Sequence, residues 1–254
     1  MSQAEAAHRR AHRLNVEARS RIIEPGISAF LARVLRRESR RQLDLLGLPS
    51  AIRKELSTAE RDQLEGLLAS FGFDQAEAVA ISTAKGLGAE RPVDRPALEL
   101  DIIRTTAIAV GRMEAELAAR VDTALRGVME QTSQEFPRPS YTEIAQRLMG
   151  ELGPESDMRP SLARDLARSF SNTVLNRGTF EGFKAARADV SWLSIVDARR
   201  RESHGRAHGL VTTPGVPFIF RGLKGGMVEA LYPGDPQLPG EERRYCRCTM
   251  RKAS

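Results

Sequence analysis

Cysteines and long apolar runs are scarce in this chain of 254 residues. The two cysteines, Cys246 and Cys248, are separated by one residue, a spacing that is poor for an ordinary disulfide. They are therefore either free thiols or part of a metal site. No uncharged run approaches the roughly 18 residues that a membrane helix needs, so we expect no membrane span. Polar and charged residues open the chain, so we expect no secretory signal peptide and a cytoplasmic site of assembly.

Motifs of common catalytic sites are also missing. The sequence contains no glycine-rich phosphate loop, no pair of carboxylates flanked by a base, and no internal repeat. The apolar stripes of its helical segments are most simply explained by packing in a core or between subunits. We therefore predict that the protein is not an enzyme.

The net charge of +6 is unevenly distributed along the chain. Residues 1–55 carry 12 basic and 6 acidic side chains, residues 184–254 carry 13 and 7, and the stretch between them is acidic overall. Basic ends permit contact with nucleic acid or with an acidic protein surface. Solvated arginine-rich helix faces explain the same pattern equally well, so charge alone does not decide between the two interpretations.

An amphipathic helix is predicted after a break at Pro25-Gly26. Its apolar residues recur at helical spacing, and they are Ile27, Phe30, Leu31, Val34 and Leu35. The opposite face collects Arg33, Arg36, Arg37, Arg40 and Arg41, which are candidate contacts to DNA or to a partner. The helix thus offers one face to a core or partner and one basic face to solvent or phosphate.

The rest of the segment up to about residue 190 also has helical periodicity. Capping boxes at Ser57–Glu60 and Ser140–Glu143 predict two helix starts. Stops are predicted at Phe71-Gly72-Phe73 and at Gly86-Leu87-Gly88. The longest helices are expected at about 97–133 and 160–187.

The character of the sequence changes near Ser191. Prolines and glycines become frequent, and short β-type runs occur at Val216–Phe220 and Met227–Tyr232. Thr213-Pro214-Gly215-Val216 has the pattern of a turn, and it leads directly into the first of these runs. We therefore predict a helical domain over 1–190 and a small α+β domain over 191–254, so that a mainly α N-terminal body precedes a small α+β C-terminal domain.

Four fragments of this second region follow one another in a specific order. They are Trp192, the run Asp197-Ala198-Arg199-Arg200-Arg201-Glu202-Ser203-His204-Gly205-Arg206-Ala207-His208-Gly209, then Tyr232-Pro233-Gly234-Asp235, and Tyr245-Cys246-Arg247-Cys248. The succession resembles the Mu F-like, or phage head morphogenesis, family. Its members carry a tryptophan, an Asp-x-Arg-x-Arg-x-x-His run ending in glycine, a Tyr-Pro-Gly-Asp-like segment and a Cys-Arg-Cys tripeptide. The resemblance covers roughly 165–250, and the earlier helical part fits only in general character.

The resemblance implies a non-enzymatic minor head protein of a tailed phage or prophage, which acts in procapsid assembly near the portal. The implied partners are the portal protein and the major capsid or scaffold proteins, with packaged double-stranded DNA as a further contact. The implied location is the virion, with several copies in each particle. The implied structural motif comprises Trp192, Asp197, Arg199, Arg201, Tyr232, Pro233, Gly234 and Asp235.

Two departures from the family concern polar positions. Arg168-Ser169-Phe170 stands where relatives often carry Arg-Thr-Glu, so the role of that glutamate is missing at this place. Some relatives carry Cys-x-x-Cys where this chain has Arg201 and His204, and with the later Cys-x-Cys they look like zinc sites with four ligands. Arg201 cannot ligate a metal, which weakens the expectation of zinc in this chain.

Four side chains could still form a zinc site here: His204, His208, Cys246 and Cys248. Structural zinc takes four nitrogen or sulfur ligands in a tetrahedron. If 197–208 is helical, the two histidines lie one turn apart on the same face. Otherwise the histidine and the cysteines pack and hydrogen-bond in a small core without metal, so no cofactor is firmly expected and zinc stays open.

The remaining motif residues are expected to be structural. Asp197 could pair with Arg199 or Arg201 and set the turn before the helix, and catalysis by an Asp–His pair would lack a nucleophile. Asp235 is expected to bind nearby amides within a turn set by Pro233 and Gly234. Alternative functions are a nucleic-acid-binding module and a metal-dependent nuclease or toxin-like protein. Six residues follow Cys248 in this sequence, so we expect no fused effector domain.

Overall fold

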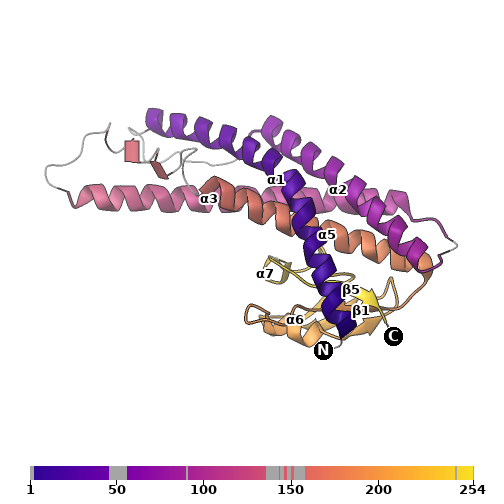
Figure 1. The fold of residues 1–254 in the computed structure, drawn as a ribbon. Helices are drawn as coiled ribbons and strands as arrows, with labels where there is room; N and C mark the ends of the chain where they lie inside the picture. The colour runs from indigo at the N-terminus through magenta and orange to yellow at the C-terminus, as the bar shows by residue number, and fades with distance from the viewer. Residues whose placement is uncertain are drawn as a thin grey trace. The chain divides into compact units, whose positions relative to one another are not determined.

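Long helices make up most of the part of the chain that the structure describes. The structure, a computed structural model, describes residues 3–45, 56–89, 91–135, 143, 146–147, 150–151, 158–243 and 245–253, without the side chains of 35–45, 125, 129, 133 and 158–161. The long helices are α1 (Gln3–Leu45), α2 (Thr58–Gly86), α3 (Arg95–Ser133) and α5 (Met158–Ala186) (Figure 1).

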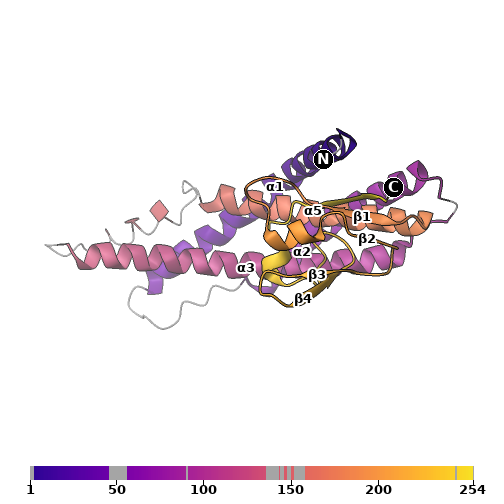
Figure 2. The same cartoon turned by 90° about the horizontal axis from the view of Figure 1, so that it is seen from below.

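Short strands and short helices follow these long helices. They are β1 (Val190–Leu193), α6 (Glu202–Ala207), β2 (Val211–Thr212), β3 (Phe218–Arg221), β4 (Met227–Ala230), α7 (Gly240–Arg243) and β5 (Thr249–Lys252), and Figure 2 shows most of them from below. The predicted fold class, a mainly α body followed by a small α+β region, is confirmed. None of the described helices combines the length and the hydropathy that a membrane span requires.

Contacts divide the chain into two compact units, and each long helix contributes one part to each. Unit 1 comprises Met1–Ile22, Leu68–Ile108 and Ala167–Ser254, and unit 2 comprises Ile23–Leu67 and Ala109–Leu166. The predicted division into 1–190 and 191–254 stays a prediction, and β1 begins at Val190.

Helix α1 passes through Pro25, so the predicted break at Pro25-Gly26 is wrong. A proline inside a helix removes one backbone hydrogen bond and crowds the preceding turn. Burial of the same turn outweighs this cost, because Ile23 and Ile27 are 3% and 0% exposed within unit 2. Gly26 also lies close to Leu67, since an added Cβ would be 3.1 Å from its Cδ2.

Helix α2 likewise continues through Phe71-Gly72-Phe73, where the sequence predicted a stop. A Cβ on Gly72 would lie 2.9 Å from the Phe170 ring and 3.0 Å from Ile102. The glycine therefore marks a close approach of other helices in unit 1, and it does not end α2.

Other local signals act as predicted. Glu60 donates its backbone N–H to the Ser57 hydroxyl at 3.3 Å, and its carboxylate accepts the Ser57 N–H at 2.9 Å, which is the expected capping box. Helix α2 ends at Gly86, and Gly88 adopts a φ of +70°. The second predicted capping box, at Ser140–Glu143, lies largely outside the described residues.

The core of unit 2 is built from the apolar stripes of its helix segments. Arg61 on α2 pairs with Glu114 on α3 at 2.5 Å within the same unit. The core side chains at 2% exposure or less include Ile27, Phe30, Leu31, Val34, Leu64, Val110, Met113, Leu117, Val121 and Leu162.

Two glycines let α5 approach α2 closely inside unit 1. A Cβ at Gly178 would lie 2.4 Å from the carbonyl oxygen of Ala76, and one at Gly182 would lie 2.8 Å from that of Ala80. Both alanines are fully buried. The two helix backbones are therefore in direct contact, which no larger residue at these positions permits.

The strands form two small antiparallel sheets. In the first, β1 lies between β2 and β5, with Trp192 opposite Met250. In the second, β3 pairs with β4 and places Phe218 opposite Ala230. The predicted strands at Val216–Phe220 and Met227–Tyr232 thus exist with slightly different ends.

The start of α1 docks onto β5 through one helical face. Glu5 pairs with Arg251 at 2.8 Å, and His8 Nε2 donates to the Met250 carbonyl oxygen at 2.8 Å. One turn later, the His12 ring contacts Thr249 Oγ1 at 3.1 Å and Asn172 Oδ1 at 2.9 Å. The first turns of the chain are therefore part of the same unit as its last strand.

The close contact between α5 and α2 generates a first prediction. Gly178→Ala should lower the thermal unfolding midpoint, because overpacking of this kind costs about 1–3 kcal/mol. The control is Gly127→Ala on α3, where an added Cβ meets no atom within 4 Å. There the better helix propensity of alanine should stabilise the protein by roughly 0.5–1 kcal/mol. Equal midpoints for the two variants would contradict the close approach.

Candidate metal centre

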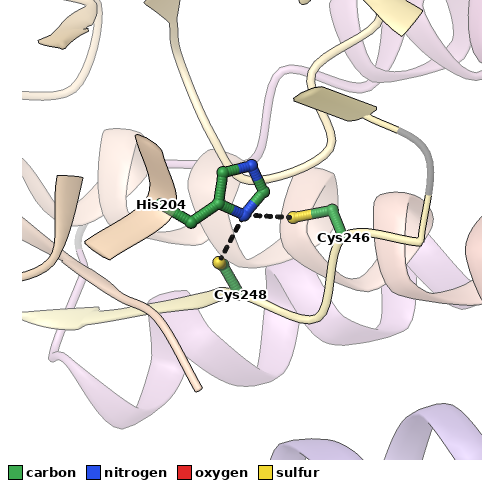
Figure 3. Close-up of side chains that lie close together, drawn as sticks. All are labelled: His204, Cys246 and Cys248. Carbon is green, nitrogen blue, oxygen red and sulfur yellow. Dashed lines mark hydrogen bonds between the residues drawn. The ribbon is translucent and has the colours of Figure 1, made fainter. Parts of the chain in front are cut away.

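Three of the four predicted ligands converge in the C-terminal region. His204 lies on α6, and Cys246 and Cys248 flank Arg247 in the segment before β5. His204 Nδ1 is 3.2 Å from Cys248 Sγ and 4.0 Å from Cys246 Sγ, and it points between the two sulfurs (Figure 3). The three ligand atoms all lie within 4.8 Å of one another.

The other nitrogen of the His204 ring is held by Glu242. His204 Nε2 donates to the Glu242 carbonyl oxygen at 3.0 Å and lies 3.3 Å from its carboxylate. The carboxylate is itself anchored, because it accepts the Ser203 hydroxyl at 2.7 Å and the Leu223 N–H at 2.5 Å. A neutral ring with its proton on Nε2 presents the lone pair of Nδ1 to the sulfurs. Metal-binding histidines are commonly oriented by such a carboxylate.

All members of this cluster are buried. His204, Cys246 and Cys248 are 3–4% exposed, and Glu242 is 1% exposed. Trp192, which is fully buried, meets the His204 ring edge-on at a centroid distance of 6.2 Å. Phe220 meets the same ring at 6.5 Å. The aromatic walls fix the ring plane and keep water away from most of the cluster.

The two thiols influence each other's ionisation. The pKa of Cys246 lies well below its usual range, because Cys248 donates a hydrogen bond to its sulfur and because the His204 ring lies nearby. Burial, together with the charge on Cys246, raises the pKa of Cys248 well above its usual range. The pKa directions place the thiolate charge on Cys246, whereas His204 Nδ1 is nearer to Cys248. We therefore assign the charge to the interacting pair of sulfurs and not to one of them.

The pKa of His204 itself is raised. Burial pulls this pKa down, but the hydrogen bond and the negative charge of Cys246 outweigh burial. A thiolate beside an imidazole is a centre that a cation can enter by displacing protons, because metal ligands bind in their deprotonated forms.

The distances fit a tetrahedral ion. Zinc binds sulfur at about 2.3 Å and nitrogen at about 2.0–2.1 Å, which places its sulfur and nitrogen ligands about 3.6 Å apart. The observed distances of 3.2 and 4.0 Å lie on either side of that value. Shifts of a few tenths of an ångström would therefore bring both nitrogen–sulfur distances to the tetrahedral value.

His208 does not join the cluster. Helix α6 ends at Ala207, and His208 follows in an extended conformation, so the assumed helix over 197–208 is wrong. The His208 ring accepts the Ser194 N–H through Nδ1 at 3.3 Å. Burial is the largest cause that lowers its pKa. Gly209, with a φ of +82°, turns the chain away immediately afterwards.

Asp197 pairs with an arginine that the sequence analysis did not assign to it. Its carboxylate binds both terminal nitrogens of Arg247, at 2.7 and 2.9 Å, so the expected side-chain partners Arg199 and Arg201 are wrong. Arg199 contributes only its backbone N–H, at 3.0 Å from Asp197 Oδ1. The hydrogen bonds to Arg247 hold the pKa of Asp197 below its usual range. The pair ties the loop before α6 to the cysteine segment.

A small cavity of about 20 Å³ lies beside His204 and Cys248. This volume is enough for one water-sized atom. Four arginines form much of its wall: Arg199, Arg200, Arg201 and Arg247. Among the described residues that line it, none is acidic.

The Tyr232–Asp235 segment forms the predicted turn. Asp235 accepts the backbone N–H groups of Leu231 at 2.7 Å and Gln237 at 2.9 Å, while Gly234 adopts a φ of +84°. Pro233 lies between the buried Tyr232 ring and this glycine. Asp235 is 2% exposed, and burial raises its pKa. The turn is thus a buried structural element of unit 1.

A buried ion pair beneath this turn escaped the sequence analysis. Arg177 on α5 contacts Glu181 at 2.5 Å and Asp101 on α3 at 2.6 Å, and its guanidinium lies over the Tyr232 ring. Arg177 and Glu181 are spaced four apart, which is the only sequence signal for their pairing. The same spacing is common on exposed helix faces, so the signal does not reveal burial.

The predicted basic face is described only at its start. Arg33 is exposed and donates to Gln63 Oε1 at 3.0 Å. The side chains of Arg36, Arg37, Arg40 and Arg41 lie outside the described residues. The expected contact of this face with DNA or a partner stays a prediction.

Comparison with known proteins finds no relative. No protein-family model matches this sequence, and no curated protein or solved structure shows a significant similarity to it. The resemblance to Mu F-like proteins therefore rests on the four ordered fragments alone.

Proposed function

We propose that this chain is a non-enzymatic minor head component of a tailed phage or prophage that acts in procapsid assembly near the portal. The proposal rests on one observation. Three of the four fragments that together resemble Mu F-like proteins meet in one buried centre, in which Trp192 packs on His204 and His204 faces Cys246 and Cys248. A shared core explains why these fragments occur together. Portal, capsid or scaffold proteins are the partners, and packaged DNA is a further contact of the basic regions.

In this proposal the cluster of His204, Cys246 and Cys248 holds a zinc ion with a structural task. Thiolate and imidazole ligands suit zinc, and Glu242 orients the imidazole as a carboxylate does in many zinc sites. The ion links α6 to the segment before β5, so it stabilises the contact between these two segments.

A metal-dependent nuclease or toxin-like protein is the second candidate. One observation favours it, namely that the cluster supplies three ligands and adjoins a cavity lined by four arginines. Catalytic zinc sites keep one position open, and arginines bind phosphate.

Head assembly is tested by deleting the gene in the source strain and inducing particle formation. We expect the protein among the peptides of purified particles, and we expect deletion to reduce the number of DNA-filled heads seen by electron microscopy. A plasmid copy should restore them. An undiminished yield of filled heads, with the protein absent from the particles, would overturn the proposal.

Zinc is tested by elemental analysis of protein purified without chelators. We expect about one zinc ion for each chain, and we expect His204→Ala and Cys248→Ser to lose it. His208→Ala is the matched control, because His208 lies outside the cluster, and it should retain the metal. Removal of zinc should lower the unfolding midpoint, since a ligand bound only by the folded state stabilises it. A metal content near zero in the wild type would exclude the site.

A plasmid-nicking assay with added divalent metal separates the two candidates. The head-component proposal predicts no nicking by the wild-type protein. If His204→Ala abolishes nicking and His208→Ala retains it, the head-component proposal is overturned and the nuclease is supported. Nicking that persists in His204→Ala would indicate contamination by another enzyme.

A further inference from the structure

The metal centre proposed above has one coordination position that no described protein side chain fills. Only His204, Cys246 and Cys248 come together among the described residues. Glu242 is close, but it lies on the Nε2 side of the imidazole, and its carboxylate oxygens accept hydrogen bonds from Leu223 and Ser203. A tetrahedral ion here would therefore have a fourth ligand other than a described side chain.

The cavity beside the cluster is the place for that ligand. It borders His204 and Cys248, and its volume of about 20 Å³ admits one oxygen atom but no larger group. Water satisfies this limit, and so does one oxygen of a larger anion whose remaining atoms stay outside. The cavity size thus allows binding through a single oxygen and excludes a chelating ligand.

The wall of the cavity favours an anion over water. Arg247 is held in place by two hydrogen bonds that it donates to the Asp197 carboxylate, and Arg201 is the N-cap residue of helix α6. Arg199 and Arg200 are exposed at the rim, where they can reach atoms that remain outside the cavity. Guanidinium groups bind phosphate oxygens with short, charge-assisted hydrogen bonds.

We propose that the fourth position of the centre is open and exchangeable, and that it takes one oxygen of a phosphate group held by Arg199 and Arg200. In this exchange the phosphate oxygen replaces a metal-bound water, and no covalent bond of the phosphate changes. The phosphate comes either from free inorganic phosphate or from a nucleic-acid backbone. The inference rests on the zinc site of the proposed function, and it assigns to that site a ligand that a closed structural zinc would not accept.

Cobalt(II) loaded in place of zinc provides the test, because its visible absorption bands report the ligands that surround it. Thiolate-to-cobalt charge transfer first shows that Cys246 and Cys248 bind the ion. Inorganic phosphate and a single-stranded oligothymidylate are then titrated separately, with the ionic strength held constant by perchlorate. We expect the visible bands to shift in a saturable way with at least one of the two probes. A shift with phosphate alone identifies the free anion, and a shift with the oligonucleotide identifies the backbone.

Two double variants show whether the arginines hold the phosphate. Arg199→Gln with Arg200→Gln should weaken the phosphate-dependent shift by roughly tenfold in affinity, because each variant side chain removes one exposed charge contact. Arg206→Gln with Arg221→Gln is the matched control, because it removes two exposed arginines that do not line the cavity. The phosphate affinity of this control should stay near that of the wild type, although its net charge equals that of the variant with Arg199→Gln and Arg200→Gln.

The possible failures are distinguishable. If the charge-transfer band does not form, the metal centre is absent, and both the zinc proposal and this inference fall. If the band forms but neither probe moves the visible bands, the zinc site stands and the open position is wrong. Equal loss of affinity in both double variants would show that phosphate responds to net charge alone, which overturns the role of Arg199 and Arg200.

Discussion

The hydrogen bond between Glu242 and the His204 ring organises the end of this chain. It turns Nδ1 towards the two cysteine sulfurs, so the ring nitrogen faces both possible sulfur ligands. A buried carboxylate is costly unless its oxygens are satisfied, and here Ser203 and Leu223 satisfy them. Glu242, which lies on α7, therefore joins this helix to Ser203 and His204 on α6 and to Leu223 in the turn after β3.

A second buried polar centre supports the turn at Tyr232–Asp235 within unit 1. Arg177 is 3% exposed, yet its charge is balanced by Glu181 and Asp101 and covered by the rings of Phe180 and Tyr232. Removal of one partner from such a pair leaves an uncompensated buried charge, which is strongly destabilising. The small C-terminal region is thus held by two polar centres as well as by its aromatic core.

Local signals in the sequence were reliable where the interacting residues lie within a few positions of each other. Ser57 and Glu60 form the expected capping box, and Gly86 ends α2 as expected. Gly72 and Pro25 misled for a common reason. Each residue weakens an isolated helix, but in the folded protein the neighbouring side chains of other helices decide whether the helix continues. Sequence periodicity cannot show which helices those are.

The sequence by itself determined the fold class, the helix and strand periodicities, and the set of residues able to bind a metal. These depend on residue type and short-range spacing, which are visible without coordinates. Only the tertiary structure decided which of these residues meet. It brought His204 to Cys246 and Cys248, left His208 aside because α6 ends at Ala207, and paired Asp197 with Arg247 from the cysteine segment. Contacts across about 40–50 residues depend on how the strands and turns between them fold, and no local pattern records that path.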